Sequence, residues 1–311
     1  MRGRFAPSPT GALHVGNLRT ALIAWLSARA QGGELIVRME DLDPVTSSPR
    51  HEAGQLADLA ALGLAADGPV VRQSDRFDLH RAAVADLAAR DLVYPCYCTR
   101  REIREAAAAP HGDPLPDGAY PGTCRHLSAR ERSQRERDGR PAALRLRADG
   151  RRVSVVDRVA GPTTGVVDDV VLVRNDGVPA YNLAVVVDDH LQGVTEVVRG
   201  DDLLSSTPRQ VHLQQLLGFA TPAYAHVPLV VGVDGSRLAK RHGATTLAEL
   251  AERGMAPATL LAVLGASLGL CRPDETVTVA DLATRFSFDS LPRVAWTFSA
   301  DAVIDAAGLP R

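Results

Sequence analysis

The segment that decides the fold of this chain is RFAPSPTGALHVGN, residues 4–17. A short apolar strand pattern covers residues 2–6, and a helix pattern follows at residues 16–30. Gly16 lets the backbone come close to a ligand, and the helix start directs N–H groups and the positive end of its dipole at anionic oxygens. His14 adds a hydrogen-bond donor at the same place. The sequence therefore predicts a site for a planar, phosphorylated ligand between the first strand and the first helix.

The alternation of strand and helix patterns continues beyond this segment and predicts an α/β fold with a doubly wound, parallel, Rossmann-like sheet. We expect further strands at residues 34–40 and 70–73, and further helices at residues 51–62 and 77–90. In such a sheet the ligand lies at the carboxyl ends of the strands. Glu40 stands at one of these ends, and the residues after Val198 stand at another.

The pattern breaks at Tyr94, where an insertion with little periodicity begins. Its expected strands cover residues 143–147, 153–159 and 166–173, before a hairpin turn at 175–177. The main sheet should resume with strands at 183–187 and 195–199, and helices at 246–253 and 257–270 should precede a loose tail. The expected units are the first half of a nucleotide-binding domain, an insertion, the second half of the domain and a helical appendix, at residues 1–93, 94–180, 181–244 and 245–311.

Composition and charge limit the classes of protein that this chain can represent. It has 311 residues, of which 45% are apolar and 23% charged, and its net charge is −2. These values are ordinary for a globular protein and do not indicate nucleic-acid binding, although a local basic face can still bind phosphates. The run at residues 129–140 mixes acidic and basic side chains, which favours a solvated helix face. With no signal peptide or membrane span in the sequence, we expect a cytoplasmic monomer.

Four cysteines in such a chain are better read as thiols or metal ligands than as disulfides. Three of them lie close together in the sequence, at Cys96, Cys98 and Cys124, whereas Cys271 fits a small buried apolar residue. A C-x-C pair reaches one metal only from a sharp turn, because alternate side chains of a strand face opposite ways. From the thiols alone, zinc and unrelated packing are equally favoured. The fourth ligand also stays open, with Tyr120, His111 and His126 as candidates.

Two separated motifs together resemble the signatures of class I aminoacyl-tRNA synthetases. Residues 4–17 are similar to the HIGH signature, with Val15 and Asn17 in place of the usual Ile and His. Residues 237–241, RLAKR, are similar to the KMSKS signature and keep its second lysine as Lys240. The resemblance implies that ATP, accompanied by Mg²⁺, is bound by His14, Gly16, Arg237 and Lys240, with His14, Gly16 and Lys240 serving catalysis.

Three further stretches are similar to bacterial glutamyl-tRNA synthetases, at residues 38–43, 181–190 and 198–210. The resemblance implies a pocket for L-glutamate lined by Arg4, Ala6, Ser8, Glu40, Tyr181 and Arg199, with Glu40 on the substrate amino group. Paired arginines suit a ligand with two carboxylates, although a lone arginine at a strand end more often makes a surface salt bridge. The resemblance also favours one structural Zn²⁺ held by Cys96, Cys98, Tyr120 and Cys124.

Only about 70 residues follow Lys240, too few for a domain that reads an anticodon. The chain therefore resembles the truncated paralogues called glutamyl-Q tRNA(Asp) synthetases. That resemblance implies transfer of glutamate to queuosine at the wobble position of tRNA(Asp), with the anticodon stem-loop as partner. The alternatives are a compact glutamate-activating enzyme with another acceptor and a nucleotide-binding regulator without catalysis. The joint presence of His14, Glu40 and Lys240 argues against the regulator.

Overall fold

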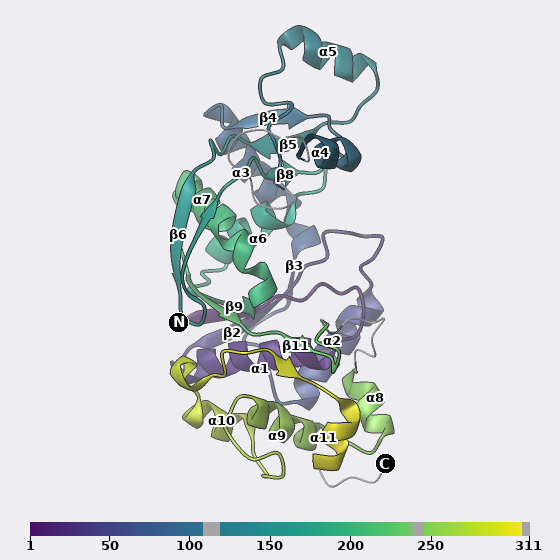
Figure 1. Cartoon of the computed structure of the whole chain (residues 1–311), viewed down its shortest axis with the longest axis vertical. Coiled ribbons are helices and arrows are strands. Elements are labelled where there is room, and N and C mark those ends of the chain that lie inside the picture. Colours follow the sequence, from purple (N-terminus) through teal and green to yellow (C-terminus); the bar gives the residue numbers. More distant parts are fainter. Residues whose placement is uncertain (108–118, 237, 239–244, 307–311) are drawn as a thin grey trace.

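The computed structural model describes residues 1–107, 119–236, 238 and 245–306 of the chain (Figure 1). A parallel sheet in the order β1-β2-β3 forms its first half, and helix α1 crosses between the first two strands. The strands are β1 (Arg2–Phe5), β2 (Glu34–Met39) and β3 (Val71–Arg72), and the helices are α1 (Val15–Ala30) and α2 (Pro49–Ala61). The predicted unit of strand, crossover helix and parallel strand is confirmed.

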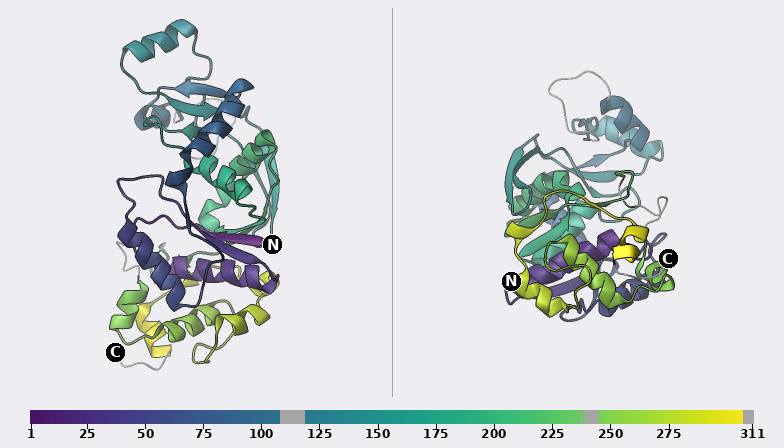
Figure 2. Two further views of the ribbon diagram at one scale, coloured as in Figure 1. Left: turned by 180° about the vertical axis from the view of Figure 1, so that it is seen from behind. Right: turned by 60° about the horizontal axis from the view of Figure 1, so that its bottom comes forward.

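The second half of the sheet is also parallel and lies beside β1. Strand β9 (Glu196–Gly200) pairs with β10 (Ala223–Val227), and the N–H of Thr195 donates to Arg2 O (2.9 Å). Helices α6 (Tyr181–Leu191) and α7 (Thr207–Leu217) cover the face opposite α1 (Figures 1 and 2). Helices therefore lie on both faces of a parallel sheet, as the predicted doubly wound class requires.

The predicted strand at residues 183–187 is wrong, because these residues lie within helix α6. All side chains from Leu183 to Asp189 are buried, so the helix shows none of the polar faces that reveal a 3.6-residue period. Its valines also favour strands in short-range reasoning. A helix enclosed by a sheet and by neighbouring helices has the same sequence pattern as a buried strand.

The insertion forms two small antiparallel sheets, of which the first lies away from the parallel sheet and the second packs against α7 and β10 (Figure 1). The first contains β4 (Val93–Cys96), β5 (Ala143–Leu146) and β8 (Val171–Val173), and the second pairs β6 (Arg152–Asp157) with β7 (Gly161–Val166). The single strand expected at 166–173 is wrong, because the chain leaves β7 at Val166 and begins β8 at Val171. Between them, Asp168 and Asp169 turn buried carboxylates toward hydrogen-bond donors.

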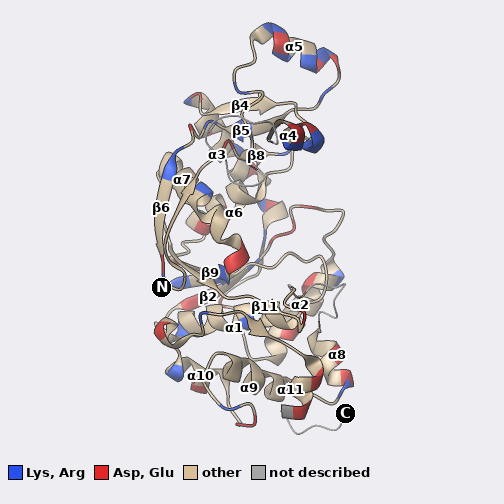
Figure 3. Ribbon diagram, viewed as in Figure 1, with Lys and Arg blue, Asp and Glu red and all other residues tan. Residues whose placement is uncertain are grey.

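Helix α3 (Phe77–Ala89) leads into the insertion, which also carries α4 (Arg100–Ala107) and α5 (Ala129–Arg137). No residue of α5 is buried, and blue (Lys, Arg) and red (Asp, Glu) segments of the ribbon alternate along it at the far end of the molecule (Figure 3). The predicted solvated helix face is confirmed. The exact boundaries of the four expected units stay a prediction.

The C-terminal region packs beneath α1 and is not a loose tail. It comprises α8 (Leu247–Glu252), α9 (Pro257–Ser267), α10 (Val279–Arg285) and α11 (Ala300–Ala306), of which α10 contacts α1. Strand β12 (Trp296–Thr297) pairs in parallel with β11 (Val230–Val231). A two-residue strand has no measurable periodicity, which is why the sequence did not indicate it. None of the helices in the described ranges has the length and apolar character needed to cross a membrane.

Candidate active site

A cavity of about 540 Å³ opens at the carboxyl ends of β1, β2 and β9. The switch-point position predicted from the sequence is therefore the place where the cavity lies. Of the predicted pocket residues, the described ones all line it: Arg4, Ala6, Ser8, His14, Gly16, Glu40, Tyr181 and Arg199. One end of the cavity is built from charged side chains and the other from the turn that precedes α1.

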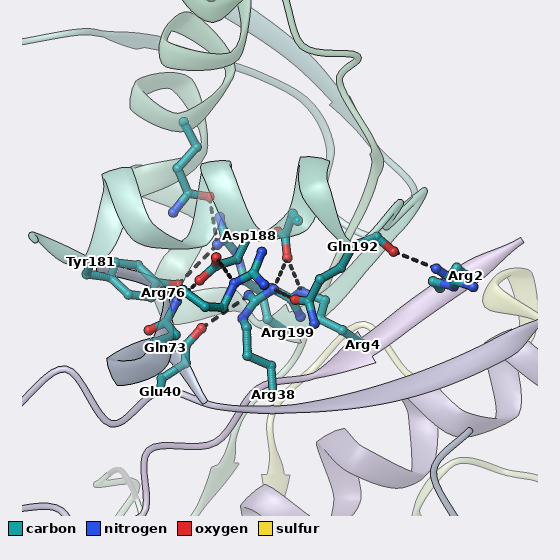
Figure 4. A network of polar contacts seen from close by, with 12 residues as sticks. Arg2, Arg4, Arg38, Glu40, Gln73, Arg76, Tyr181, Asp188, Gln192 and Arg199 are labelled. Atoms are coloured by element: carbon teal, nitrogen blue, oxygen red, sulfur yellow. Dashed lines mark hydrogen bonds and ion pairs between the residues drawn. The ribbon is translucent and has the colours of Figure 1, made fainter. Parts of the chain in front are cut away.

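The charged end rests on a buried network of arginines and carboxylates (Figure 4). Arg38 is fully buried and its Nη1 donates to Asp189 Oδ1 (2.7 Å), while its Nη2 lies 3.4 Å from Glu40 Oε1. The Nε of Arg4 lies 3.5 Å from the same Asp189 oxygen, and its Nη1 donates to Val198 O (3.1 Å). Asp189 on α6 therefore holds Arg4 of β1, which lines the pocket, and the buried Arg38 of β2, which does not line it.

Arg199 is held differently, because every hydrogen-bond partner found for it is neutral or an uncharged backbone group. Its Nη1 donates to Gln210 Oε1 (2.8 Å) and to the Tyr181 hydroxyl (3.3 Å), and its Nη2 donates to Thr207 Oγ1 (2.9 Å). The Nε–H donates to His226 Nε2 (2.9 Å). No carboxylate within salt-bridge distance neutralises this buried cation among the described residues.

Charge at this end of the cavity therefore does not cancel. In this network Arg4, Arg38, Arg76 and Arg199 carry four positive charges, and Asp188, Asp189 and Glu40 carry three negative charges when ionised, which leaves one net positive charge. Burial raises the pKa of the Glu40 carboxyl, against the lowering effects of Arg38 and Arg4. A ligand with one net negative charge and an ammonium group for Glu40 would complete the balance.

The other end of the cavity is formed by the start of α1. His14 is the helix N-cap: its Nδ1 accepts from the Asn17 N–H (3.2 Å), and the Asn17 side chain accepts from the His14 N–H (3.2 Å). A Cβ on Gly16 would lie only 2.9 Å from His14 Cε1. The glycine therefore lets the imidazole lie directly on the helix backbone. Capping, the ordinary role of a polar residue at a helix start, is combined here with a place in the cavity wall.

Arg237 and Lys240 lie outside the described residues. Their described neighbours flank the same end of the cavity: Leu238 lines it, and Thr245 O accepts from the Val15 N–H (3.0 Å) at the start of α1.

The three clustered cysteines of the insertion come together with Tyr120. The candidate ligand atoms of Cys96, Cys98 and Cys124 all lie within 4.8 Å of one another. The Tyr120 hydroxyl lies 3.3 Å from Cys96 Sγ and 3.6 Å from Cys98 Sγ. Three sulfur atoms and one oxygen at these separations fit a tetrahedral Zn²⁺ site of the closed, structural kind.

The tyrosine in this cluster is fixed in place by its own contacts. Its hydroxyl accepts from the Cys124 N–H (2.8 Å), and its ring lies 3.7 Å from the Arg145 guanidinium carbon. Hydrogen bonds from the Cys124 and Cys98 thiols lower the pKa of the Cys96 thiol, which favours one thiolate. Of the competing candidates, His126 is not in the cluster, and His111 lies outside the described residues. Cys271 is only partly buried, and its thiol donates to Ala262 O.

Several residues of the site were missed by sequence reasoning. Asp189 and Arg38 lie in the stretches that carry the resemblance, yet only the fold shows that they join Arg4 and Glu40 in one network. His226 and Asp157 gave no signal, because their partners lie 27 and 69 positions away in the sequence. A buried histidine between two apolar strand residues has the same local pattern as an ordinary core position.

Comparisons with known proteins agree with this geometry. The model for the tRNA synthetases class I (E and Q) catalytic domain matches residues 1–303. The chain is 55% identical to the glutamyl-Q tRNA(Asp) synthetase of Nocardia farcinica, covering 99% of this chain and 96% of that protein. It is 46% identical to that of Symbiobacterium thermophilum, covering 98% of each. A crystal structure of a glutamate tRNA ligase from Elizabethkingia meningosepticum in complex with its amino acid matches with a TM-score of 0.82 and 28% identity, over 98% of this chain and 68% of that one.

The chain therefore belongs to the family of class I tRNA synthetases (E and Q). Within that family it groups with the glutamyl-Q tRNA(Asp) synthetases, which confirms the resemblance found in the sequence. It is an enzyme of the ligase type, as predicted.

Proposed function

We propose that this enzyme activates L-glutamate with ATP to glutamyl-adenylate and transfers the glutamate to queuosine at the wobble position of tRNA(Asp). The observation that carries the proposal is that one cavity has an uncancelled positive charge at one end and a glycine-lined helix start at the other. Glutamate brings one net negative charge and ATP brings phosphates. The names of the two relatives described above support the tRNA acceptor.

Glutamate would lie against the charged end of the cavity. Arg4 and Arg199 supply planar donors for carboxylates, and the Glu40 carboxylate accepts the substrate ammonium group. The Tyr181 hydroxyl, already 3.3 Å from Arg199 Nη1, closes the pocket beside them. Ala6 and Ser8 form the wall on the β1 side and leave room for the side chain.

ATP would lie across the turn before α1, with its phosphates toward the helix start. In the first step the glutamate α-carboxylate oxygen bonds to the α-phosphorus, and the bond from that phosphorus to the bridging oxygen breaks, so pyrophosphate leaves with the electron pair. Negative charge then grows on phosphate oxygens, and His14, Arg237 and Lys240 are the donors that would stabilise it. Mg²⁺ would enter with the nucleotide phosphates and neutralise part of their charge.

In the second step a cyclopentene hydroxyl of queuosine would attack the carbonyl carbon of the adenylate, and AMP would leave. The anticodon stem-loop is then the part of the tRNA that faces the cavity. We place a structural Zn²⁺ in the insertion, held by Cys96, Cys98, Cys124 and Tyr120, because this donor set fits the metal and these four residues belong to one small core cluster. The monomeric state stays a prediction.

The proposal is tested by two assays on the full chain. We expect glutamate-dependent exchange of pyrophosphate into ATP without any tRNA, because the described glutamate and ATP residues already share one cavity. Labelled glutamate should then appear only on tRNA taken from cells that make queuosine. Label on tRNA that lacks queuosine would favour the compact enzyme with another acceptor, and no exchange at all would favour the regulator.

A further inference from the structure

We propose that His226 and Asp157 are positioning residues for glutamate: they hold the Arg199 guanidinium in its donor orientation without cancelling its charge. The inference rests on the proposed binding of glutamate by Arg199. It concerns a chain of buried contacts that runs from the hairpin of the insertion, through β10, to the cavity.

The three side chains are joined by two short contacts. Arg199 Nε–H on β9 donates to His226 Nε2 on β10 (2.9 Å), and the opposite ring nitrogen, Nδ1, lies 2.6 Å from Asp157 Oδ2. Both His226 and Asp157 have fully buried side chains, and Arg199 is 5% exposed. Strands β9 and β10 are paired with Arg199 opposite His226, so the sheet itself sets the arginine beside the imidazole.

Asp157 fixes which nitrogen of His226 carries the proton. Its carboxylate accepts from the His226 backbone N–H (3.1 Å) and from the N–H groups of Val159 and Ala160 (2.8 Å each). Although burial opposes it, the hydrogen bond from His226 holds the pKa of Asp157 below its usual value, so the group is an acceptor. The proton between the two side chains therefore belongs to Nδ1, and Nε2 keeps the lone pair that Arg199 needs.

The imidazole is kept neutral by its surroundings. Burial lowers the pKa of His226, and the Arg199 and Arg4 charges lower it further against the raising effect of Asp157. The carboxyl group of Asp201, which lies directly after β9, also interacts electrostatically with the His226 ring. A protonated ring would have no acceptor for Arg199 and would add a second cation beside it. The neutral tautomer is the form that the contacts require.

In a pocket that binds an anion, an arginine has to be oriented without losing its positive charge, and this arrangement does both. A carboxylate in direct contact would orient Arg199 equally well, but it would neutralise the charge that attracts the substrate. An intervening neutral imidazole accepts the Nε–H and leaves the full positive charge facing the cavity. The Asp157 carboxylate, which orients the imidazole, is separated from the Arg199 guanidinium by the imidazole ring. At this greater distance its attraction for the guanidinium is weaker.

The test uses four variants of the full chain. His226→Phe removes the contacts of the ring with Arg199 and Asp157 and also its contact with Thr207 Oγ1 (3.1 Å). His226→Gln places a carbonyl oxygen near the Nε2 position, and Asp157→Asn removes the charge that orients the ring. His212→Gln is the matched control, since His212 is also buried but lies on α7 and makes no hydrogen bond to Arg199 among the described residues. The pyrophosphate-exchange assay gives KM for glutamate, KM for ATP and kcat, and thermal melting reports folding.

We expect His226→Phe to raise KM for glutamate about tenfold or more, which corresponds to leaving one buried donor unpaired, with KM for ATP within about twofold. His226→Gln should recover most of that loss, and Asp157→Asn should raise KM for glutamate about threefold. His212→Gln should leave both constants unchanged. Equal increases of both constants, or no increase for glutamate, would overturn the inference in favour of a purely structural role.

A second readout does not depend on the variants folding. Nitrogen-15 NMR of the parent protein should show His226 protonated on Nδ1 alone at neutral pH, and a proton on Nε2 would overturn the inference directly. Failure of the proposed function is distinguishable, because the parent protein would then show no exchange with glutamate. Parent activity with an unaffected His226→Phe variant would reject only the positioning role.

Discussion

The two ends of the cavity are built on different principles. At the charged end, where we propose that glutamate binds, buried side chains from β1, β2, α6 and β9 hold one another in place, with Arg38 fully buried and Asp189 shared between two arginines. At the other end, where we propose that the nucleotide binds, the shape comes from the backbone turn before α1, where Gly16 lets the His14 ring lie on the helix. Charge therefore defines one end and backbone geometry the other.

Because of this difference, specificity and rate should depend on opposite ends of the cavity. Buried charge discriminates between ligands strongly, because a ligand that leaves it unmatched pays a desolvation penalty. The backbone turn before α1 instead selects a ligand by its shape. The charge of the phosphates must then be stabilised by donors from other segments, such as Arg237 and Lys240. Changes at the glutamate end should alter the choice of amino acid, and changes at the nucleotide end should alter turnover and ATP affinity.

The largest effect is expected at Arg199. Arg199→Ala should lower kcat/KM for glutamate by about a thousandfold and remove most of the preference over glutamine, because the side-chain carboxylate of glutamate loses its buried partner. The parent should activate glutamate best, then aspartate, then glutamine. Exchange assays with the three amino acids measure this order, and Arg199→Lys is the control that keeps charge without the planar fork. Comparable parent activity with glutamine would contradict the charged description of this end.

Lys240→Ala should have the next largest effect, but on a different constant. Its charge is needed where negative charge grows on the phosphates, so we expect a loss of roughly 2–4 kcal/mol in transition-state stabilisation. The loss should fall on kcat, with KM for glutamate almost unchanged. Steady-state exchange kinetics separate the two constants. Unchanged turnover would mean that Arg237 or Arg241 supplies the charge.

Gly16→Ala changes the end of the cavity that is shaped by the backbone. The added Cβ would meet the His14 ring at 2.9–3.0 Å, so the ring must move and the N-cap of α1 weakens. We expect KM for ATP to rise about tenfold and KM for glutamate to stay within about twofold. Gly54→Ala on α2 is the matched control, because its Cβ would meet nothing within 4 Å. An equal rise in both constants would show that the two ends are not independent.

The smallest effect on exchange is expected from the cysteine cluster, which lies in the insertion away from both ends (Figure 1). Elemental analysis should find about one zinc per chain, held by three thiolates and one further ligand. Cys98→Ser should release it and lower the melting temperature of the insertion, with exchange kinetics within about threefold of the parent. Cys271→Ser should keep the metal. Metal-free protein with three reactive thiols and unchanged stability would remove zinc from the proposal.

The sequence predicted best what is local. Gly16 and His14 stand where one turn joins a strand to a helix, so a short window contains the whole pattern. The strand predicted at residues 183–187 failed because its helix is buried on most sides and has no polar face to count. The contact between Asp189 and Arg38 was missed for another reason. The two residues are 151 positions apart in the sequence, and no local pattern encodes such a contact. Tyr120 was selected over His111 and His126 only through the family resemblance.

The pairing of β11 with β12 affects how the enzyme is made as well as how it works. Val230 lines the cavity, and it is flanked by bonds from the C-terminal region: Trp296 N–H donates to Leu229 O (3.0 Å) and Phe298 N–H donates to Val231 O (2.8 Å). A ribosome therefore has to synthesise nearly the whole chain before this wall of the cavity is fixed. Because chains begin to fold during synthesis, the first half of the sheet can form while the cavity wall is still incomplete and the last residues are being added. Premature release should give a chain that has folded its first half but cannot hold its nucleotide.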